Sequence, residues 1–376
     1  MPEVESRRHI RRSRWVAAAA ALLVVLLVVL VLVLDGRLFS NGGSGEPTAG
    51  ATSSPGGDPS DAGGGPSDGG SSASDGGGTD AAGTVPFSAV EKMSMRFPSE
   101  KRTQSRSFNV EAGETYLLRF DVSTEKPADS PGNGFMLGVR LECTDEQGKQ
   151  VATTGGTQNL LTGDPVTLTN QVVLAPRASG VYRCSLLANA PDAALAAKGT
   201  AFALDVTWKV TEPVGVALPA QASTQLPAVI PTGATRQIFS QDVPVASLTQ
   251  RRLDVLASLY LTSCTGPGGS TEGGTQWCTQ EVIDQTGSHY RFEVRYDVIG
   301  SDGNVCGTID SGRREEYLDT YRHHQLYHVE KSVTVPADLC GDTIRTSVNL
   351  LNRGPAGLLV HGENTSMVTM ETRPVG

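Results

Sequence analysis

The sequence lacks the short motifs that identify common metal and catalytic sites. None of its six cysteines forms a C-x-x-C pair, and no H-E-x-x-H motif occurs. Structural zinc sites usually draw on two close pairs of ligands, so this spacing excludes the familiar zinc modules. An S-x-x-K motif at Ser123 to Lys126 has no S-D-N or K-T-G companion, which penicillin-recognising enzymes need. We therefore predict no catalytic residue, no metal and no cofactor.

Residues 41–83 contain no aromatic residue and no Leu, Ile or Val. A segment with so little apolar surface cannot offset the entropy lost when its backbone is ordered. Its six acidic residues have no basic partner within the segment and repel one another. The composition predicts a disordered, extended tether.

Residues 15–34 form a run of 20 apolar residues without a charge. At a rise of about 1.5 Å per residue, a helix of this length spans the hydrocarbon layer of a bilayer. Five arginines precede the run, so the positive-inside rule places residues 1–14 in the cytoplasm. A cleaved signal peptide is the alternative, but its apolar core is usually only about 7 to 15 residues long. We predict an uncleaved signal anchor in the plasma membrane, with everything after it extracellular.

Acidic residues outnumber basic ones, and the chain has a net charge of −9. Nucleic acid attracts proteins with a concentrated basic patch. The charge balance therefore excludes nucleic acid as a partner. Contact with the lipid bilayer is expected through residues 15–34 alone.

Apolar and polar residues alternate in several segments between residues 85 and 211. In residues 115–122 and 201–210 the apolar residues recur at every second position. This period is typical of β-strands with one buried face. Residues 136–143 and 180–188 repeat the pattern, and turn signals lie between the segments. The spacing predicts an antiparallel β-sandwich.

A second unit is predicted at residues 236–376, after a Pro-rich stretch that is expected to be an extended linker. Its clearest strand signal is YRFEVRYDV, residues 290–298. Residues 170–190 can be aligned with residues 330–352, so the two units are either diverged copies or unrelated sandwiches. The charged segment GRREEYLDTYRHH, residues 312–324, is expected to be a solvated loop.

The cysteine pattern predicts three disulfides, which fit an oxidising exterior. Alternation places Cys143 and Cys184 on the inward faces of two strands in the first unit. The four cysteines of the second unit allow three pairings. We predict the pairs Cys264 with Cys278, across a Gly-rich loop, and Cys306 with Cys340.

Three of the six histidines lie within residues 321–328. If residues 323–335 form a strand, His324 and His328 share one face and stand about 13 Å apart, which is too far to share one ion. These two residues are the candidates for a metal site, but a polar sheet face is the simpler interpretation. Trp277, in the disulfide loop, is the candidate for stacking against a ligand. Its alternative role is a lid on the core.

Three segments of the first unit, FNVEAGETYLLRFDV, LGVRLECTDEQGKQVAT and APRASGVYRCSLLA, carry a family resemblance. They resemble the pre-peptidase C-terminal type of secreted β-sandwich and, more loosely, jelly-roll carbohydrate-binding modules. The resemblance covers residues 105–210 and implies a fold only. The acidic strand motif usual in that type is replaced by GFMLGVRLEC, so no binding residue is carried over.

Together these patterns predict a mainly β protein with two tandem antiparallel, jelly-roll-like sandwiches. The expected parts are a cytoplasmic tail (1–14), a transmembrane helix (15–34), a disordered linker (35–84), a first sandwich (85–211), an interdomain linker (212–235) and a second sandwich (236–376). This organisation favours a non-catalytic binding or adhesion module whose partner is an envelope polymer or protein. Two alternatives stay open: a hydrolase acting on envelope glycan, and an accessory or structural subunit of a membrane complex.

Overall fold

The computed structural model describes residues 82–96, 99–125, 135–161, 163–190, 201–213, 215–267 and 270–372. The predicted transmembrane helix, the cytoplasmic tail and nearly all of the predicted disordered linker lie outside these residues. In the described part, no helix has the length and apolar character that crossing a bilayer requires. Helix is limited there to the single 3-10 turn η2 (Val245–Ser247), and antiparallel strands make up most of the rest. The predicted mainly β class is confirmed.

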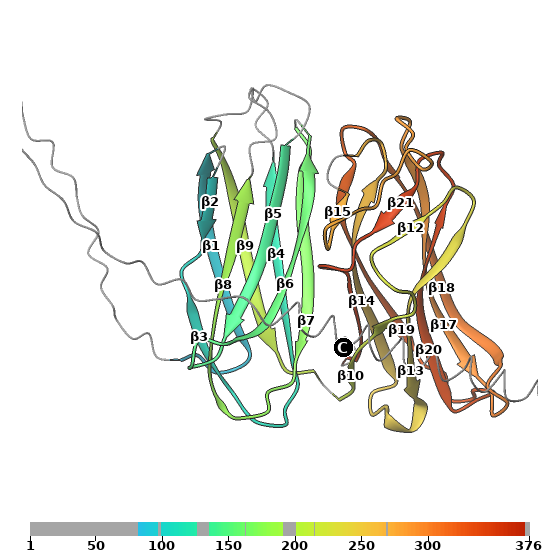
Figure 1. Ribbon diagram of the computed structural model, residues 1–376. Helices are drawn as coiled ribbons and strands as arrows, with labels where there is room; N and C mark the ends of the chain where they lie inside the picture. The colour runs from blue at the N-terminus through green and yellow to red at the C-terminus, as the bar shows by residue number, and fades with distance from the viewer. Residues whose placement is uncertain are drawn as a thin grey trace, which may run out of the picture. The chain divides into compact units, whose positions relative to one another are not determined.

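Nine strands form the first β-sandwich, here called sandwich 1 (Figure 1). They are β1 (Phe87–Arg96), β2 (Ser99–Arg102), β3 (Arg106–Val110), β4 (Tyr116–Glu125), β5 (Phe135–Thr144), β6 (Gln150–Leu160), β7 (Pro165–Leu174), β8 (Gly180–Ala190) and β9 (Ala201–Thr211). One sheet has the order β1-β9-β4-β7, and the other has the order β2-β8-β5-β6 with β3 also paired to β8.

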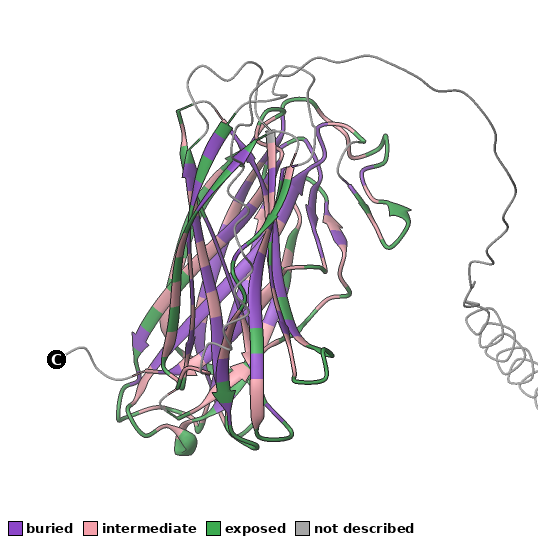
Figure 2. Cartoon of the chain, turned by 90° about the vertical axis from the view of Figure 1, so that its left-hand side faces the viewer, coloured by how far each residue is buried: buried purple, intermediate pink, exposed green. Residues whose placement is uncertain are grey.

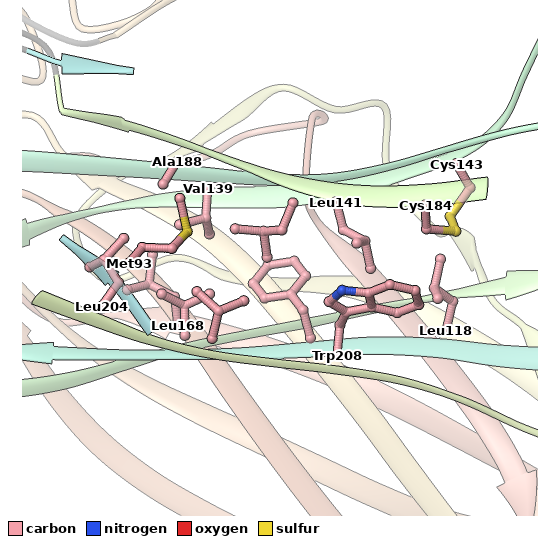
Figure 3. Packing of buried hydrophobic residues seen from close by; sticks show 14 of the residues in the cluster. Met93, Leu118, Val139, Leu141, Cys143, Leu168, Cys184, Ala188, Leu204 and Trp208 are labelled. Atoms are coloured by element: carbon pink, nitrogen blue, oxygen red, sulfur yellow. A yellow bond between two sulfur atoms is a disulfide. The ribbon is translucent and has the colours of Figure 1, made fainter. Parts of the chain in front are cut away.

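The core of sandwich 1 lies between these two sheets. Along β9, buried residues alternate with more exposed ones as the sequence pattern predicted. Figure 2 shows buried and more exposed positions following one another along the long strands. Trp208 and Phe120 are among its largest buried side chains. Figure 3 shows Trp208 beneath Leu141, with the Cys143–Cys184 disulfide at one end of the cluster. Removing this apolar surface from water is the main driving force for the fold.

The remaining strands form a second β-sandwich, here called sandwich 2. They are β10 (Ala217–Pro219), β11 (Gln221–Ala222), β12 (Ala228–Ile230), β13 (Thr235–Pro244), β14 (Arg252–Ser263), β15 (Thr271–Glu272), β16 (Thr275–Gln276), β17 (Ser288–Ile299), β18 (Val305–Leu318), β19 (His324–Thr334), β20 (Thr343–Asn352), β21 (Leu358–Val360) and β22 (Ser366–Glu371). One sheet has the order β11-β13-β20-β17-β18. In the other, β14 pairs with β19 on one side and with β22 and β21 on the other. The small hairpin β15-β16 lies outside both sheets.

The two sandwiches share one strand order. The order β1-β9-β4-β7 corresponds to β10-β22-β14-β19, and β3-β8-β5-β6 corresponds to β13-β20-β17-β18. The segments aligned on sequence, residues 170–190 and 330–352, occupy equivalent places because they contain β7-β8 and β19-β20. The common topology supports the hypothesis that the two units are diverged copies.

The predicted stretch at residues 212–235 is extended, as expected, but much of it belongs to sandwich 2 and is not a free linker. Its residues form β10, β11 and β12, which pair with β22, β13 and β21 of sandwich 2. Proline is compatible with strands at a sheet edge, where its missing N–H costs no ladder hydrogen bond. The prolines were therefore a signal of short edge strands in this stretch.

The predicted solvated loop at residues 312–324 is also wrong, because β18 continues to Leu318 and pairs with β17. Most side chains of β18 are nonetheless exposed. Charged residues along an edge strand discourage pairing with other chains. The charge pattern indicated exposure correctly but did not indicate the backbone conformation.

All three predicted disulfides are confirmed. Cys143 pairs with Cys184, Cys264 with Cys278, and Cys306 with Cys340. The first two bonds are buried, whereas both cysteines of the third are exposed.

Candidate functional site at the junction of the two sandwiches

The outer face of β14 in sandwich 2 packs against β7 of sandwich 1, and its neighbour β19 packs against both β6 and β7. Along β14, Leu253, Val255 and Leu259 face the core of sandwich 2. The alternate residues Leu256 and Ser258 are also buried, because they lie against sandwich 1. A strand covered on both faces has a nearly continuous apolar sequence, and RLDVLASLYLTS carries this signal. We call the contact surface between the two sandwiches the junction.

Two amide side chains of β7 form the polar centre of the junction. The Nδ2 group of Asn170 donates to the carbonyl oxygens of Gly155 at 2.6 Å and Asn364 at 2.8 Å. Its Oδ1 atom accepts from the hydroxyl of Ser366 at 2.9 Å. Gln171 donates to the carbonyl oxygen of Leu256 at 3.3 Å and accepts from Ser258 at 3.2 Å. These buried amides have their partners, so the contact specifies one relative position of the two sandwiches.

An apolar side chain from sandwich 2 completes the core of sandwich 1. Leu326 of β19 belongs to the same buried cluster as the core residues of sandwich 1. It fits there because residue 156 is glycine: a Cβ atom at that position would lie 2.4 Å from Leu326 Cδ2 and 2.9 Å from its Cγ. The Gly155-Gly156 pair in β6 is the sequence signal for this close approach.

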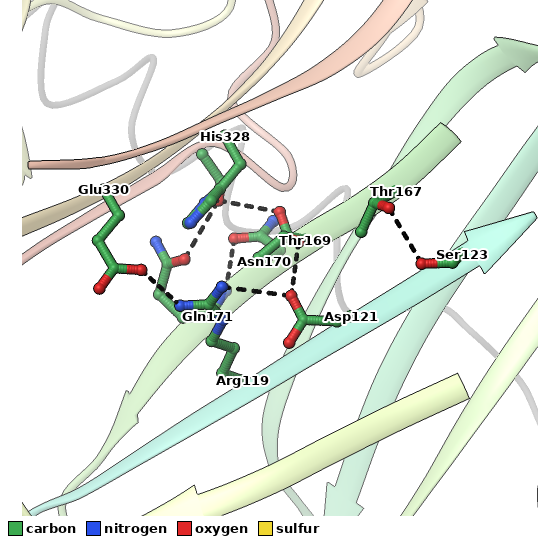
Figure 4. Close-up of polar contacts among 10 residues, drawn as sticks. Arg119, Asp121, Ser123, Thr167, Thr169, Asn170, Gln171, His328 and Glu330 are labelled. Atoms are coloured by element: carbon green, nitrogen blue, oxygen red, sulfur yellow. Dashed lines mark hydrogen bonds and ion pairs between the residues drawn. The ribbon is translucent and has the colours of Figure 1, made fainter. Parts of the chain in front are cut away.

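Ion pairs flank the junction. Arg119 of β4 donates to Glu330 of β19 at 3.0 Å and contacts Asp121 at 3.3 Å (Figure 4). Arg322 of sandwich 2 pairs with Asp164, in the turn between β6 and β7. Partly exposed pairs of this kind stabilise a contact only modestly, but they help to fix its orientation.

The predicted polar sheet face that contains His324 and His328 is not solvated. His328 Nδ1 lies 2.9 Å from the hydroxyl oxygen of Ser258 within the junction. Burial lowers the pKa of His328 to about 4, and the positive charge of Arg119 acts in the same direction. His324 is buried, and its backbone N–H donates to Asn159 Oδ1 of sandwich 1 at 2.7 Å. Burial lowers the pKa of His324 to about 3.

A chain of hydrogen bonds links His324 to a carboxylate that sequence reasoning missed. The hydroxyl of Thr262 lies 2.7 Å from His324 Nδ1 and 2.7 Å from His361 Nε2. His361 Nδ1 lies 2.7 Å from Glu272 Oε2. Burial lowers the pKa of His361, while the carboxylate of Glu272 opposes that shift. Nothing in the local sequence indicates this cluster, because its members come from four separate segments.

The hydroxyl, imidazole and carboxylate of this chain have the connectivity of a nucleophile, a base and an orienting acid. Thr262 is fully buried, and its hydroxyl is already shared between two imidazole rings. The ring of Tyr260 stacks on His361 with the centroids 4.0 Å apart, and burial raises the pKa of Tyr260 to about 12. This arrangement excludes substrate from the hydroxyl, so the chain is a structural network as it stands.

A groove opens beside the junction, and residues from both sandwiches line it. It consists of two cavities of about 210 and 480 Å³ that share Arg140 of sandwich 1 and Asn364 of sandwich 2. Glu142, at its base, accepts hydrogen bonds from Arg140 and Arg102, each at 2.7 Å. Of the described residues that line the two cavities, none has an aromatic ring, and most are polar. We call these two cavities the junction groove.

The loop that follows β21 forms one wall of the junction groove. The carboxylate of Glu272 accepts the backbone N–H groups of Gly362 at 3.0 Å and Glu363 at 2.9 Å. Asn364, in the left-handed region with φ 62°, is held by the bond from Asn170. Glu272 lies within the loop closed by the Cys264–Cys278 disulfide. The wall is thus positioned from both sandwiches.

Trp277 is not at the junction groove. It is partly buried against the small cluster of Cys264, Cys278 and Leu359. Its Nε1 atom donates to the carbonyl oxygen of Glu272 at 3.3 Å. This placement agrees with the alternative role as a lid on a core.

The two metal candidates named from the sequence, His324 and His328, occupy separate places in the structure. His324 and His328 contact different partners and are not brought together around a shared position. Across the described ranges, no group of three His, Cys, Asp or Glu side chains is arranged to hold a metal ion.

Neither a protein-family model nor a curated protein sequence matches the chain. Among solved structures, similarity extends to the tandem CBM22-1–CBM22-2 domain of Xyn10C from Paenibacillus barcinonensis, with 14% identity, 79% of this chain and 100% of that chain covered, and a TM-score of 0.23. PNGase F, a glycosylasparaginase from Flavobacterium meningosepticum, is similar with 9% identity, 76% and 97% coverage and a TM-score of 0.27. A β-porphyranase from Bacteroides plebeius has 10% identity, 73% and 37% coverage and a TM-score of 0.21. At such scores no property of those proteins transfers to this chain.

Proposed function

We propose that this protein is a non-catalytic, extracytoplasmic binding module that holds a polar polymer or protein of the cell envelope in the junction groove. The 20 apolar residues at 15–34 anchor it in the plasma membrane with its N-terminus in the cytoplasm. The tether then carries both sandwiches away from the membrane. An accessory or structural role in a membrane complex is the alternative that would use the same anchor without a ligand.

The observation that carries this proposal is the composition of the junction groove. Amide, hydroxyl and charged side chains from both sandwiches line the two adjoining cavities, where they provide donors and acceptors together. The walls are fixed by the buried contacts of Asn170 and Glu272. A preformed site binds at a lower entropic cost than one that must be ordered by its ligand.

Arg140 offers the sharpest test, because a matched control exists on the other sandwich. Arg140 and Arg313 are each just over half exposed, at 54% and 56%, and each pairs with one glutamate on a neighbouring position of its sheet. Arg313 lies on the outer sheet face of sandwich 2 and does not line the groove. Replacing either by alanine removes a similar surface ion pair.

The full-length protein is incubated with fractionated envelope glycans and with envelope proteins, and bound material is quantified. We expect Arg140→Ala to weaken binding by about 10- to 100-fold, since a hydrogen bond to a charged group contributes about 1.5–3 kcal/mol. Arg313→Ala should bind as the unmodified chain does. Equal binding by the two variants rejects the groove, and a selective loss in Trp277→Ala moves the site to the disulfide loop.

A hydrolase acting on envelope glycan is the enzymatic alternative. It is favoured by the hydrogen bonds that connect the hydroxyl of Thr262, the imidazole of His361 and the carboxylate of Glu272 in that order. It requires that the buried hydroxyl become accessible. Release of new reducing ends from the bound glycan, abolished in Thr262→Ala, would establish that activity in place of simple binding.

A further inference from the structure

The histidines of the junction are held in surroundings that suit neutral rings only. Ser258 has one hydroxyl hydrogen, and its oxygen lies within hydrogen-bonding distance of the Thr169 carbonyl, the Gln171 amide oxygen and His328 Nδ1. When Ser258 donates to either oxygen, it can only accept from His328 Nδ1. His328 Nε2 is buried and has no hydrogen-bonding partner. A proton added there would create a buried N–H cation without an acceptor.

The charges around His328 act in both directions: Arg119 disfavours a cation there, whereas Glu330 and Asp121 favour one. Arg119 and Asp121 face it from β4, and Glu330 faces it from its own strand. Both carboxylates are already bound to Arg119, at 3.0 Å for Glu330 and 3.3 Å for Asp121. A second cation beside Arg119 therefore finds no free carboxylate to pair with.

The chain of hydrogen bonds around Thr262 also suits neutral histidine rings. With neutral rings, His324 donates from Nδ1 to Thr262, Thr262 donates to His361 Nε2, and His361 donates from Nδ1 to Glu272. A proton added at His361 Nε2 turns this acceptor into a donor, so Thr262 can no longer donate a hydrogen bond to it. Among the described residues, Glu272 is the one carboxylate hydrogen-bonded to this chain, and it also accepts two backbone N–H groups. His324 faces His323 and His361, and each would repel it if protonated.

We propose that mild acid opens the junction: protonation of His324 and His328 separates β19 and β14 from β6 and β7 and thereby dismantles the junction groove. The consequence for ligand release rests on the proposed function, whereas the opening itself does not. The apolar contacts of Leu326 and the amides of β7 do not titrate, so they hold the junction closed at neutral pH.

The size of the response follows from linkage. A histidine that is freed by opening regains a pKa near 6.5, so each such residue favours the open form by up to about tenfold per pH unit below that value. Two histidines together give up to about 100-fold per pH unit. Between pH 7.5 and pH 5 the open population should therefore rise steeply while each separate core stays folded.

Hydrogen exchange of the full-length protein tests the proposal, with rates normalised for the intrinsic effect of pH. Segments 155–171 and 361–366 report on the junction, and segments 116–122 and 290–298 report on the two cores. We expect junction protection to fall by at least about tenfold from pH 7.5 to pH 5, with core protection unchanged. Constant junction protection in the unmodified chain overturns the proposal without any variant.

The double variant His324→Asn/His328→Asn keeps polar atoms near both Nδ1 positions and cannot take up a proton. It should retain junction protection at pH 5. His289→Asn serves as the control, because His289 lies on the outer face of β17 and pairs with Glu315. An acid response that persists in the double variant overturns the assignment to these histidines. Loss of ligand binding at pH 7.5 in Arg140→Ala tests the proposed function separately, since the lowered pKa values of His324 and His328 keep both rings neutral there.

Discussion

Sandwich 1 and sandwich 2 have the same strand order but differ in the side chains that their edge strands carry. In sandwich 1, the side formed by β6 and β7 carries glycines and neutral amides and is covered by sandwich 2. The equivalents of β6 and β7 in sandwich 2 are β18 and β19: β19 lies in the junction, whereas the edge strand β18 carries Arg313, Arg314, Glu315 and Glu316, and most of its side chains are exposed. One topology therefore gives an edge that docks and an edge that stays in solvent. Side-chain chemistry at the edges, rather than the fold, decides which surface associates.

The disulfides give the largest expected difference between the two sandwiches. The bond Cys143–Cys184 spans 41 residues, and Cys264–Cys278 spans 14 residues. Loop-closure entropy then predicts a loss of about 4 kcal/mol for Cys143→Ala/Cys184→Ala and about 3 kcal/mol for Cys264→Ala/Cys278→Ala. Guanidinium unfolding of each double variant measures the values. A larger loss in the second variant would show that the disulfide loop supports more of the fold than its length implies.

Leu326→Ala tests whether sandwich 1 depends on sandwich 2. The change removes a buried side chain from the core of sandwich 1 although the residue belongs to β19. We expect a loss of about 3 kcal/mol of unfolding free energy, as for other buried leucines. Val90→Ala, at a position that is 75% exposed on β1, should change it by less than about 0.5 kcal/mol. Similar small effects in both variants would mean that sandwich 1 closes its own core.

The pH dependence of the unfolding free energy distinguishes the histidines of the junction from a histidine on an outer sheet face. The pKa values of His324 and His328 are lowered to about 3 and 4 in the folded protein, so the unfolded chain binds more protons between those values and about 6.5. The free energy of unfolding must therefore fall as the pH drops below about 6.5. At pH 5 each histidine should cost about 2 kcal/mol relative to pH 7.5.

Thermal and guanidinium unfolding at both pH values check this difference. His328→Asn should reduce the acid loss, and His289→Asn, on the outer face of sandwich 2, should leave it unchanged. An equal acid loss in all three proteins would assign the effect to groups outside the junction.

The smallest expected effect concerns the outer faces themselves. Arg140→Ala and Arg313→Ala each break an ion pair between a half-exposed arginine and a mostly buried glutamate, and pairs with one exposed partner contribute about 1 kcal/mol. Their unfolding free energies should agree within about 0.5 kcal/mol. A clear difference would show that Arg140 also supports the junction and would complicate its use as a probe of binding.

Local patterns predicted the elements well where one strand face meets a core and the other meets solvent. The alternation in β9 and the three cysteine pairs are examples. The pattern failed for β10 and β12, because short strands on a Pro-rich segment have too few residues to show a period. It also failed for residues 312–318, where charges on an edge strand resemble those of a loop.

The sequence by itself determined that this chain folds as antiparallel sandwiches and which residues of the long strands face each core, because a period of two is a local fact; for the second unit it left three cysteine pairings open. Only the tertiary structure decided that the two sandwiches join, that His324, Thr262 and His361 are buried there with His328 half-buried, and that Arg140 and Asn364 line one groove. Those residues are brought together by the docking of one sandwich on the other. No spacing along the chain records that contact.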